Sequence, residues 1–149
     1  MVVDLRPFDP RDADELVLQD AQVVETLAAP GWRSQLAQAP DLGPCWSAWG
    51  DDRLLGCGGM IQQWRGRATA WCYLGAGIPR AAWVSIHRAV RARLEQAPSL
   101  GLWRVEAHVM AGFLPGKRWA EMLGMELECL ATGYLPCGGN AWLYARIFR

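Results

Sequence analysis

The sequence lacks the features that would place it in or across a membrane. The longest stretch without a charged residue, Cys129 to Ala145, is interrupted by Pro136 and several glycines, so it cannot form a spanning helix. The first residues, Met1 to Pro7, lack the basic stretch followed by an apolar run that marks a signal peptide. We therefore expect a protein of the cytoplasm that does not associate with a membrane.

Net charge of either sign is also lacking. The 15 basic and 15 acidic side chains cancel, whereas dedicated nucleic-acid binders usually carry net positive charge. All the basic residues except Lys117 are arginines, and arginine suits phosphate recognition better than lysine does. We expect no nucleic-acid partner.

The sequence offers few ligands for a metal ion. It has five cysteines and two histidines, and no two cysteines have the CxxC spacing that is typical of zinc sites. We expect no metal site, and we expect reduced cysteines that pack as small apolar residues. A nucleophilic pair of Cys72 and His108 stays open as a remote alternative, although no local motif supports it.

Length and patterning indicate one domain over residues 1–149. A chain of this size, 52% hydrophobic and 20% charged, can bury a core without disulfides. Asp12 and Glu15 have capping-box spacing at the start of a helix, and Pro79 suits the first position of another. The pattern predicts a strand at 2–6, helices at 12–29 and 32–39, strands at 45–49, 54–64 and 68–74, a helix at 79–97, a strand at 102–110, a helix at 117–123 and a closing hairpin of 127–134 and 141–148.

The connections between these elements predict the fold class. Hairpin-length turns make residues 45–74 an antiparallel meander. The helix that joins strand 68–74 to strand 102–110 is a crossover, which favours a parallel pair. We expect an α/β (α+β mixed) fold with a central mixed sheet of six to seven strands and helices on both faces.

The nine tryptophans are the most unusual part of the composition. Trp83, Trp103, Trp119 and Trp142 fall on faces predicted to point inward. The tryptophans of the meander have no such assignment, and a partly exposed cluster would form a surface for a homo-oligomer or a protein assembly.

This order of elements resembles the GNAT superfamily of N-acetyltransferases over essentially the whole chain. The stretch Arg104–Val109 followed by Arg118–Glu126 is similar to the family's fifth strand and fourth helix, and Ala141–Arg146 is similar to its last strand. The resemblance implies transfer of an acetyl group from acetyl-CoA to a primary amine, carried by a small molecule or a protein. Small GNAT-like proteins of tailed bacteriophages look similar as well, and for such a protein the virion is an alternative location.

The resemblance also implies where acetyl-CoA binds. Proteins of this family splay two parallel strands, here Thr69–Leu74 and Trp103–Met110, and acyl-CoA pairs with backbone groups in the gap as a strand would. Its pyrophosphate meets free amides at the N-terminus of the following helix. The implied cofactor-binding residues are Leu74, Gly75, Ala76, Gly77, Ile78 and Arg80.

Charge in this region fits a phosphate-rich ligand. Glu95 is the only acidic residue between positions 65 and 95. A solvated helix face would explain the same charges, and this alternative stays open. The arginines concerned are Arg65, Arg67, Arg80, Arg88, Arg91 and Arg93.

The sequence departs from the family pattern at three places. The segment Gly75–Pro79 is shorter than the usual pyrophosphate loop. Ala120 stands where the family has a catalytic tyrosine, and Phe113 or a neighbour stands where an asparagine is expected.

Other side chains are candidate substitutes for catalysis. Glu106 and His108 share a strand face beside the gap, and either could act as a base. Tyr73, on the opposite strand, could act as the acid. Each also has a structural interpretation, as a polar group paired with arginine or as a packed aromatic.

Two functions of different classes therefore stay open, and a peptide or small-ligand binder unrelated to CoA is a distant third. The first is an acyl-CoA-dependent N-acyltransferase that uses the gap between the two strands. The second is a catalytically inactive GNAT-like binding or structural module, in which a side chain such as Trp71 or Ile78 fills that gap.

Overall fold

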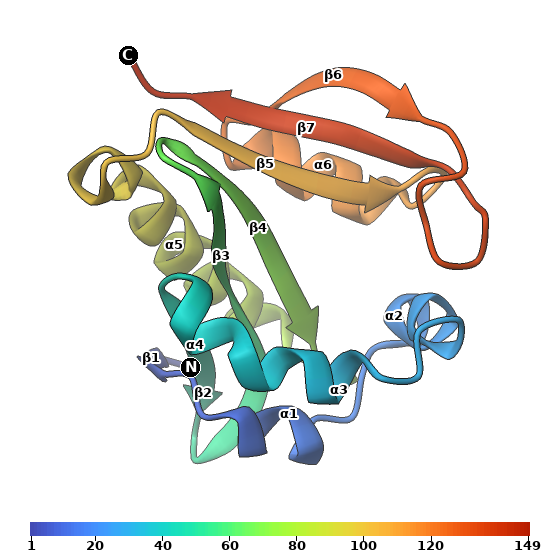
Figure 1. Ribbon diagram of the computed structural model, residues 1–149. Coiled ribbons are helices and arrows are strands. Elements are labelled where there is room, and N and C mark those ends of the chain that lie inside the picture. The colour runs from blue at the N-terminus through green and yellow to red at the C-terminus, as the bar shows by residue number, and fades with distance from the viewer.

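All strands of the chain join one mixed sheet in the order β1-β2-β3-β4-β5-β7-β6 (Figure 1). The computed structural model describes residues 1–149, apart from the side chain of Val24. Only the β4–β5 pair is parallel, as the crossover predicts. The strands are β1 (Val3–Pro7), β2 (Cys45–Gly50), β3 (Arg53–Trp64), β4 (Arg67–Leu74), β5 (Arg104–Met110), β6 (Glu126–Ala131) and β7 (Ala141–Ile147).

Helices cover both faces of this sheet. In Figure 1, α3 and α4 lie in front of the strands, and α5 and α6 lie behind them. The predicted fold class is thus confirmed, with seven strands. The helices are α1 (Pro10–Glu15), α2 (Asp20–Leu27), α3 (Trp32–Gln35), α4 (Ala39–Leu42), α5 (Arg80–Glu95) and α6 (Leu114–Met122), and short 3-10 turns, η1 (Leu36–Gln38) and η2 (Ala97–Leu100), follow α3 and α5.

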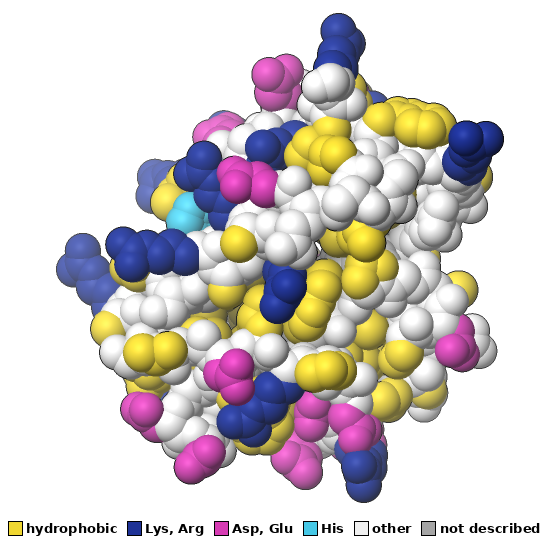
Figure 2. Space-filling model, turned by 90° about the vertical axis from the view of Figure 1, so that its left-hand side faces the viewer, with side chains coloured by type: hydrophobic (Ala, Val, Ile, Leu, Met, Phe, Trp, Pro, Cys, Tyr) yellow, Lys and Arg dark blue, Asp and Glu magenta, His cyan; other side chains and the backbone are white. Residues whose placement is uncertain are grey.

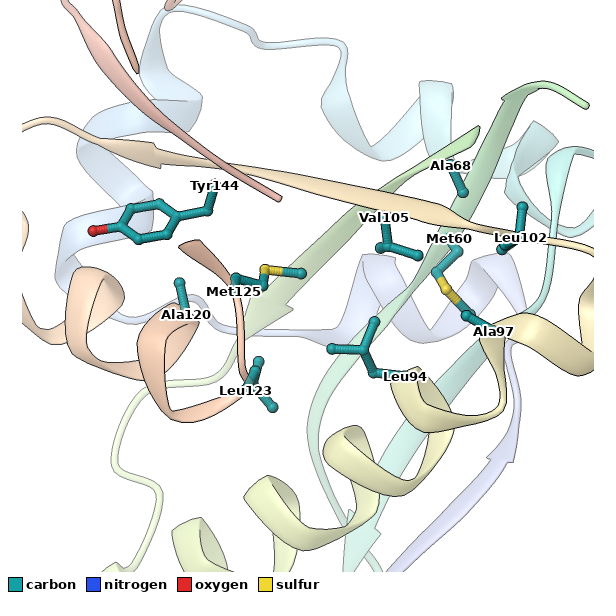
Figure 3. Close-up of a cluster of buried hydrophobic side chains, with 10 residues drawn as sticks. All are labelled: Met60, Ala68, Leu94, Ala97, Leu102, Val105, Ala120, Leu123, Met125 and Tyr144. Atoms are coloured by element: carbon teal, nitrogen blue, oxygen red, sulfur yellow. The ribbon is translucent and has the colours of Figure 1, made fainter. Parts of the chain in front are cut away.

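The largest buried cluster lies between the sheet and the pair α5 and α6 (Figure 3). Val105 of β5 is fully buried there with Leu94 of α5, Ala120 of α6 and Tyr144 of β7. Because side chains alternate along a strand, Glu106 and His108 of β5 point to the opposite face, where the N-terminal helices pack. The face of β5 that α5 and α6 cover therefore carries core residues, and the opposite face carries polar side chains.

The N-terminal helices differ from the prediction. The capping box is formed by Asp9 and Asp12, so α1 begins at Pro10 and ends at Glu15. The predicted helix 12–29 is wrong, because the chain is non-helical from Leu16 to Gln19 before α2 begins. Leu18 is buried there and forms a β-bridge with Gly75.

Exposed tryptophans lie at the edge of the fold. Trp103, predicted to point inward, lies just before β5 and is 52% exposed, and Trp64, the last residue of β3, is 61% exposed. No helix among the described residues is long and apolar enough to cross a membrane.

Candidate active site

The parallel strands β4 and β5 separate soon after they start. Their pairing covers only three positions, from Arg67 with Arg104 to Thr69 with Glu106. Beyond this point β5 remains paired with β7 up to Met110, while β4 continues to Leu74 on its own course. The two strands thus diverge as Figure 1 shows, and α2 lies beyond the tip of β4 on the side of β5.

A cavity of about 390 Å³ occupies the region where the strands diverge. Ligand sites in proteins typically have volumes of about 300–1,000 Å³. Ala70 of β4, Ala107 of β5, and Gly116 and Ala120 of α6 are among its lining residues, and side chains of this size leave room for a ligand. The Ala120 that replaces the expected tyrosine is therefore part of the cavity wall.

The gap is filled by neither Trp71 nor Ile78, the two bulky side chains that could have occupied it. Trp71 lines the cavity, but its ring packs edge-on against Phe8, with centroids 5.7 Å apart. Ile78 packs against the buried cluster that contains Ala82 and Ile86 of α5. The diverging strands therefore leave room for a ligand.

The edge of β4 that faces the gap carries backbone donors and acceptors. The N–H of Met60 on β3 donates to the carbonyl of Pro44 and so points away from β4. Met60 and Ala70 are therefore a pair without mutual hydrogen bonds, and the backbone N–H and C=O of Ala70 point away from β3, toward the gap. Because the direction of the backbone groups alternates along a strand, the N–H and C=O of Cys72 and of Leu74 also point into the gap. Because the ladder with β5 ends at Thr69, the N–H of Cys72 has no partner among the described residues.

Farther along, this edge is bonded to the N-terminal region. The side-chain amide of Gln22 donates to the carbonyl of Cys72 (2.8 Å) and accepts from the N–H of Leu74 (2.6 Å). The N–H of Gln19 donates to the carbonyl of Leu74 (2.9 Å), and the N–H of Ala76 donates to the carbonyl of Val17 (2.7 Å).

The predicted cofactor-binding residues therefore divide into two groups. The amides of Leu74, Gly75 and Ala76 are used within the protein, that of Gly75 by the carbonyl of Leu55 at 2.7 Å. The later part of the loop is open, with Gly77 and Arg80 exposed and Ile78 half-buried. In the described chain the N–H groups of Gly77, Ile78 and Arg80 have no protein partner, so the segment that can meet an anion starts at Gly77.

The arginines are not gathered around this loop, contrary to the expectation from sequence. Arg67 stands at the start of β4, the opposite end from the loop, and Arg91 near the end of α5 pairs with Glu95 at 3.0 Å. The basic groups beside the loop are Arg80 and Arg53, which donates to the carbonyls of Ala76 (2.6 Å) and Gly77 (3.2 Å). Figure 2 shows the side of the molecule on the left of Figure 1, where Lys and Arg side chains are scattered among acidic and hydrophobic ones.

Glu106 is engaged in a buried ion-pair network. Arg67 donates two bonds of 2.7 Å to its carboxylate, and Arg104, which also pairs with Glu128, donates one of 2.6 Å. Arg67 first, with Arg104, lowers the pKa of Glu106 to about 2. Glu106 does not line the cavity, so its geometry is that of a structural counter-ion.

His108 and Tyr73 both line the cavity, from opposite sides of the gap. The His108 ring stacks on Tyr134, with centroids 4.2 Å apart, and burial lowers its pKa, so the ring is neutral at neutral pH. Tyr73 packs on Trp32 at 4.3 Å, and burial raises its pKa to about 12, so its hydroxyl stays protonated. No hydrogen bond links the Cys72 thiol to His108 among the described side chains, so geometry does not support a nucleophilic pair.

Sequence reasoning missed two polar cavity residues on α2, Gln22 and Glu25. Glu25 is the only acidic side chain among the described residues that line the cavity, and burial raises its pKa above the ordinary value of 4.5. An acid in an apolar cavity with a raised pKa is a candidate proton acceptor. The sequence around Glu25 did not indicate a site, because only the tertiary fold brings α2 close to β4. Among the described residues no cluster of His, Cys, Asp and Glu has the geometry of a metal site.

Comparison with known proteins identifies the fold. No family model matches the sequence, and no curated protein matches it by sequence. Solved structures do match: Ard1 from Thermoplasma volcanium has a TM-score of 0.80 at 15% identity, over 100% of this chain and 99% of that one. A GNAT-family acetyltransferase from Bacillus anthracis has a TM-score of 0.76 at 16% identity, over 99% and 95% of the two chains.

An acetyltransferase from Bacillus subtilis, crystallised with CoA, is also similar, with a TM-score of 0.73 at 12% identity over 99% of each chain. The fold of this chain is therefore the GNAT acetyltransferase fold. At these identities the likeness defines the fold, and the chemistry must be argued from the site.

Proposed function

We propose that this protein is an acyl-CoA-dependent N-acyltransferase that moves an acetyl group from acetyl-CoA to a primary amine. The observation that carries the proposal is the divergence of β4 and β5 after three paired positions, with a cavity of about 390 Å³ in the gap. Solved structures of the same fold support it, since the proteins from Bacillus anthracis and Bacillus subtilis are acetyltransferases and the latter contains CoA.

The gap offers groups that fit the parts of acetyl-CoA. The N–H of Cys72, the first unpaired donor where the strands separate, suits the thioester carbonyl, because a fixed donor stabilises charge that develops there. The amides of Gly77 and Ile78 and the start of α5 with Arg80 suit the pyrophosphate. Acetyl-CoA supplies an activated thioester, whose acyl carbon the amine attacks while the carbon–sulfur bond breaks.

Two cavity side chains suit the proton transfers. Glu25 accepts the proton that the amine loses, because its raised pKa makes it a stronger base than an ordinary carboxylate. Tyr73 stays protonated and donates to the leaving thiolate sulfur. Both lie on walls of the same cavity, and the neutral ring of His108 lines it from the other strand.

A test follows acetyl transfer from acetyl-CoA to a panel of primary amines, small molecules and peptides with free N-termini, with mass detection of the acetylated product. The proposal predicts amine-dependent transfer that falls in Glu25→Gln and persists in the control Glu15→Gln, whose side chain is exposed on α1. Transfer to no amine, by a protein that binds acetyl-CoA, would overturn the catalytic part.

One observation favours a second candidate function, a catalytically inactive GNAT-like binding or assembly module. Side-chain and backbone groups of residues 17–22 already use part of the β4 edge, and the amides of Gly75 and Ala76 are bonded within the protein. Such a module would not bind acetyl-CoA at all. Exposed Trp64 and Trp103 would then offer surface for a protein partner.

A further inference from the structure

Gln22 binds β4 through its side chain, whereas its neighbours bind β4 through their backbone. The single carboxamide of Gln22 satisfies the carbonyl of Cys72 at 2.8 Å and the N–H of Leu74 at 2.6 Å. Its oxygen also accepts a 3.4 Å bond from the side chain of Gln19. One amide donor and one amide acceptor thus stand where a neighbouring strand would present its own peptide groups.

The backbone of residues 17–19 holds Gln22 in this place. The bonds from Gln19 to Leu74 and from Ala76 to Val17 anchor the chain just before α2, and Leu18 is buried beside them. Gln22 itself is only half-buried, and no described residue of α2 belongs to a buried cluster. The side chain can therefore rotate away while the backbone anchor and Glu25 stay in place.

The groups that Gln22 occupies are the next ones along the edge from the free N–H of Cys72. A ligand whose thioester carbonyl meets Cys72 would place the amides of its pantetheine arm against the carbonyl of Cys72 and the N–H of Leu74. The N–H of Leu74 cannot serve Gln22 and the ligand at once, since it has one proton to donate. Binding must therefore break that bond, and because the same carboxamide also donates to Cys72, the side chain that leaves Leu74 gives up both bonds.

We propose that the Gln22 side chain competes with acyl-CoA for β4, so that it must leave β4 before the pantetheine arm can bind. This inference rests on the proposed function. It makes Gln22 a residue that sets the affinity for acyl-CoA, while the backbone anchor at residues 17–19 keeps α2 in position.

The test compares acetyl-CoA binding by isothermal titration in the wild-type protein and in Gln22→Ala and Gln22→Met. Methionine has nearly the size of glutamine without its amide, so it separates hydrogen bonding from volume. Freeing two hydrogen bonds of ordinary net strength tightens binding by about 5- to 150-fold. Gln35→Ala, on exposed α3 residue Gln35, is the control and leaves the affinity unchanged.

A second measurement is independent of the ligand. Amide hydrogen exchange at Leu74 is slow in the unliganded wild-type protein, because Gln22 accepts that N–H, and becomes fast in Gln22→Ala while the protein remains folded. Unchanged protection at Leu74 would overturn the inference.

The outcomes separate the two proposals. Equal or weaker acetyl-CoA binding by both Gln22 variants, with normal binding by the wild type, would overturn only the competition. Absence of binding by all the proteins would overturn the competition together with the proposed function.

Discussion

Replacing Glu106 by glutamine should destabilise the protein strongly, because its carboxylate is a buried counter-ion for two arginines. The side chain of Glu106 is 5% exposed, and it accepts three bonds of 2.6–2.7 Å from Arg67 and Arg104. Removing one member of a buried ion pair typically costs about 3–5 kcal/mol of unfolding free energy. Arg104 retains Glu128 as a partner, so we expect a loss at the lower end, about 3 kcal/mol.

The pKa of Glu106 leads to the same magnitude. Lowering it from 4.5 to about 2 corresponds to about 3 kcal/mol in favour of the folded, charged state. Because the folded-state pKa is lowered, this stabilisation is present above the unfolded value of 4.5 and is lost as the pH falls toward 2. The difference between wild type and Glu106→Gln should therefore shrink in that window.

Urea denaturation, followed by tryptophan fluorescence, measures both effects. The wild type and Glu106→Gln are compared at about pH 7 and about pH 3, with Glu126→Gln on exposed β6 as the control, which should change stability by less than about 0.5 kcal/mol. A loss below about 1 kcal/mol at neutral pH, or a loss that does not diminish in acid, would show that the ion pairs do not stabilise the fold as argued.

Three further predictions concern the site and the turn before β4. Glu25→Gln should lower kcat/KM by about 10²–10⁴-fold, because it removes the general base, with little effect on acetyl-CoA affinity. In the wild type, the acid limb of the pH–rate profile should lie above pH 4.5, because burial raises the pKa of Glu25. Arg80→Ala should weaken acetyl-CoA binding by about tenfold or more in a titration, because it removes a charged partner for phosphate; an unchanged Kd would place the pyrophosphate elsewhere. Gly66→Ala should lower Tm more than Gly101→Ala does, since both residues have positive φ (+88° and +78°) but only a Cβ at Gly66 would overlap the Trp103 ring, which would have to shift; equal changes in Tm would contradict the clash.

The periodic parts of the sequence predicted the fold well. Alternation along residues 102–110 puts Glu106 and His108 on one shared face, and in the structure Val105 on the other face is buried in the core. The crossover from β4 through α5 to β5 predicted the parallel pair, and with it the place where a gap opens. These features depend on local periodicity and chain connection, which a sequence displays directly.

The N-terminal part of the site could not be predicted in the same way. Apolar spacing suggested one helix through residues 16–19, but pairing with Gly75, far along the chain, makes this segment extended. Gln22 and Glu25 read as ordinary polar positions of a helix, because only the tertiary fold brings them to β4. The same pairing uses the amide of Ala76, which the family resemblance assigned to a cofactor.

The central claim is that the gap between β4 and β5 binds acetyl-CoA, with the N–H of Cys72 as its first free donor. Amide proton–nitrogen NMR of the unliganded protein, titrated with acetyl-CoA, tests it most directly. The account predicts saturable shifts that are largest at the Cys72 amide, with further shifts at Gly77, Ile78 and along β5 from Ala107 to Met110. Saturation with no shift at these positions, or no shift anywhere at millimolar acetyl-CoA, would contradict it.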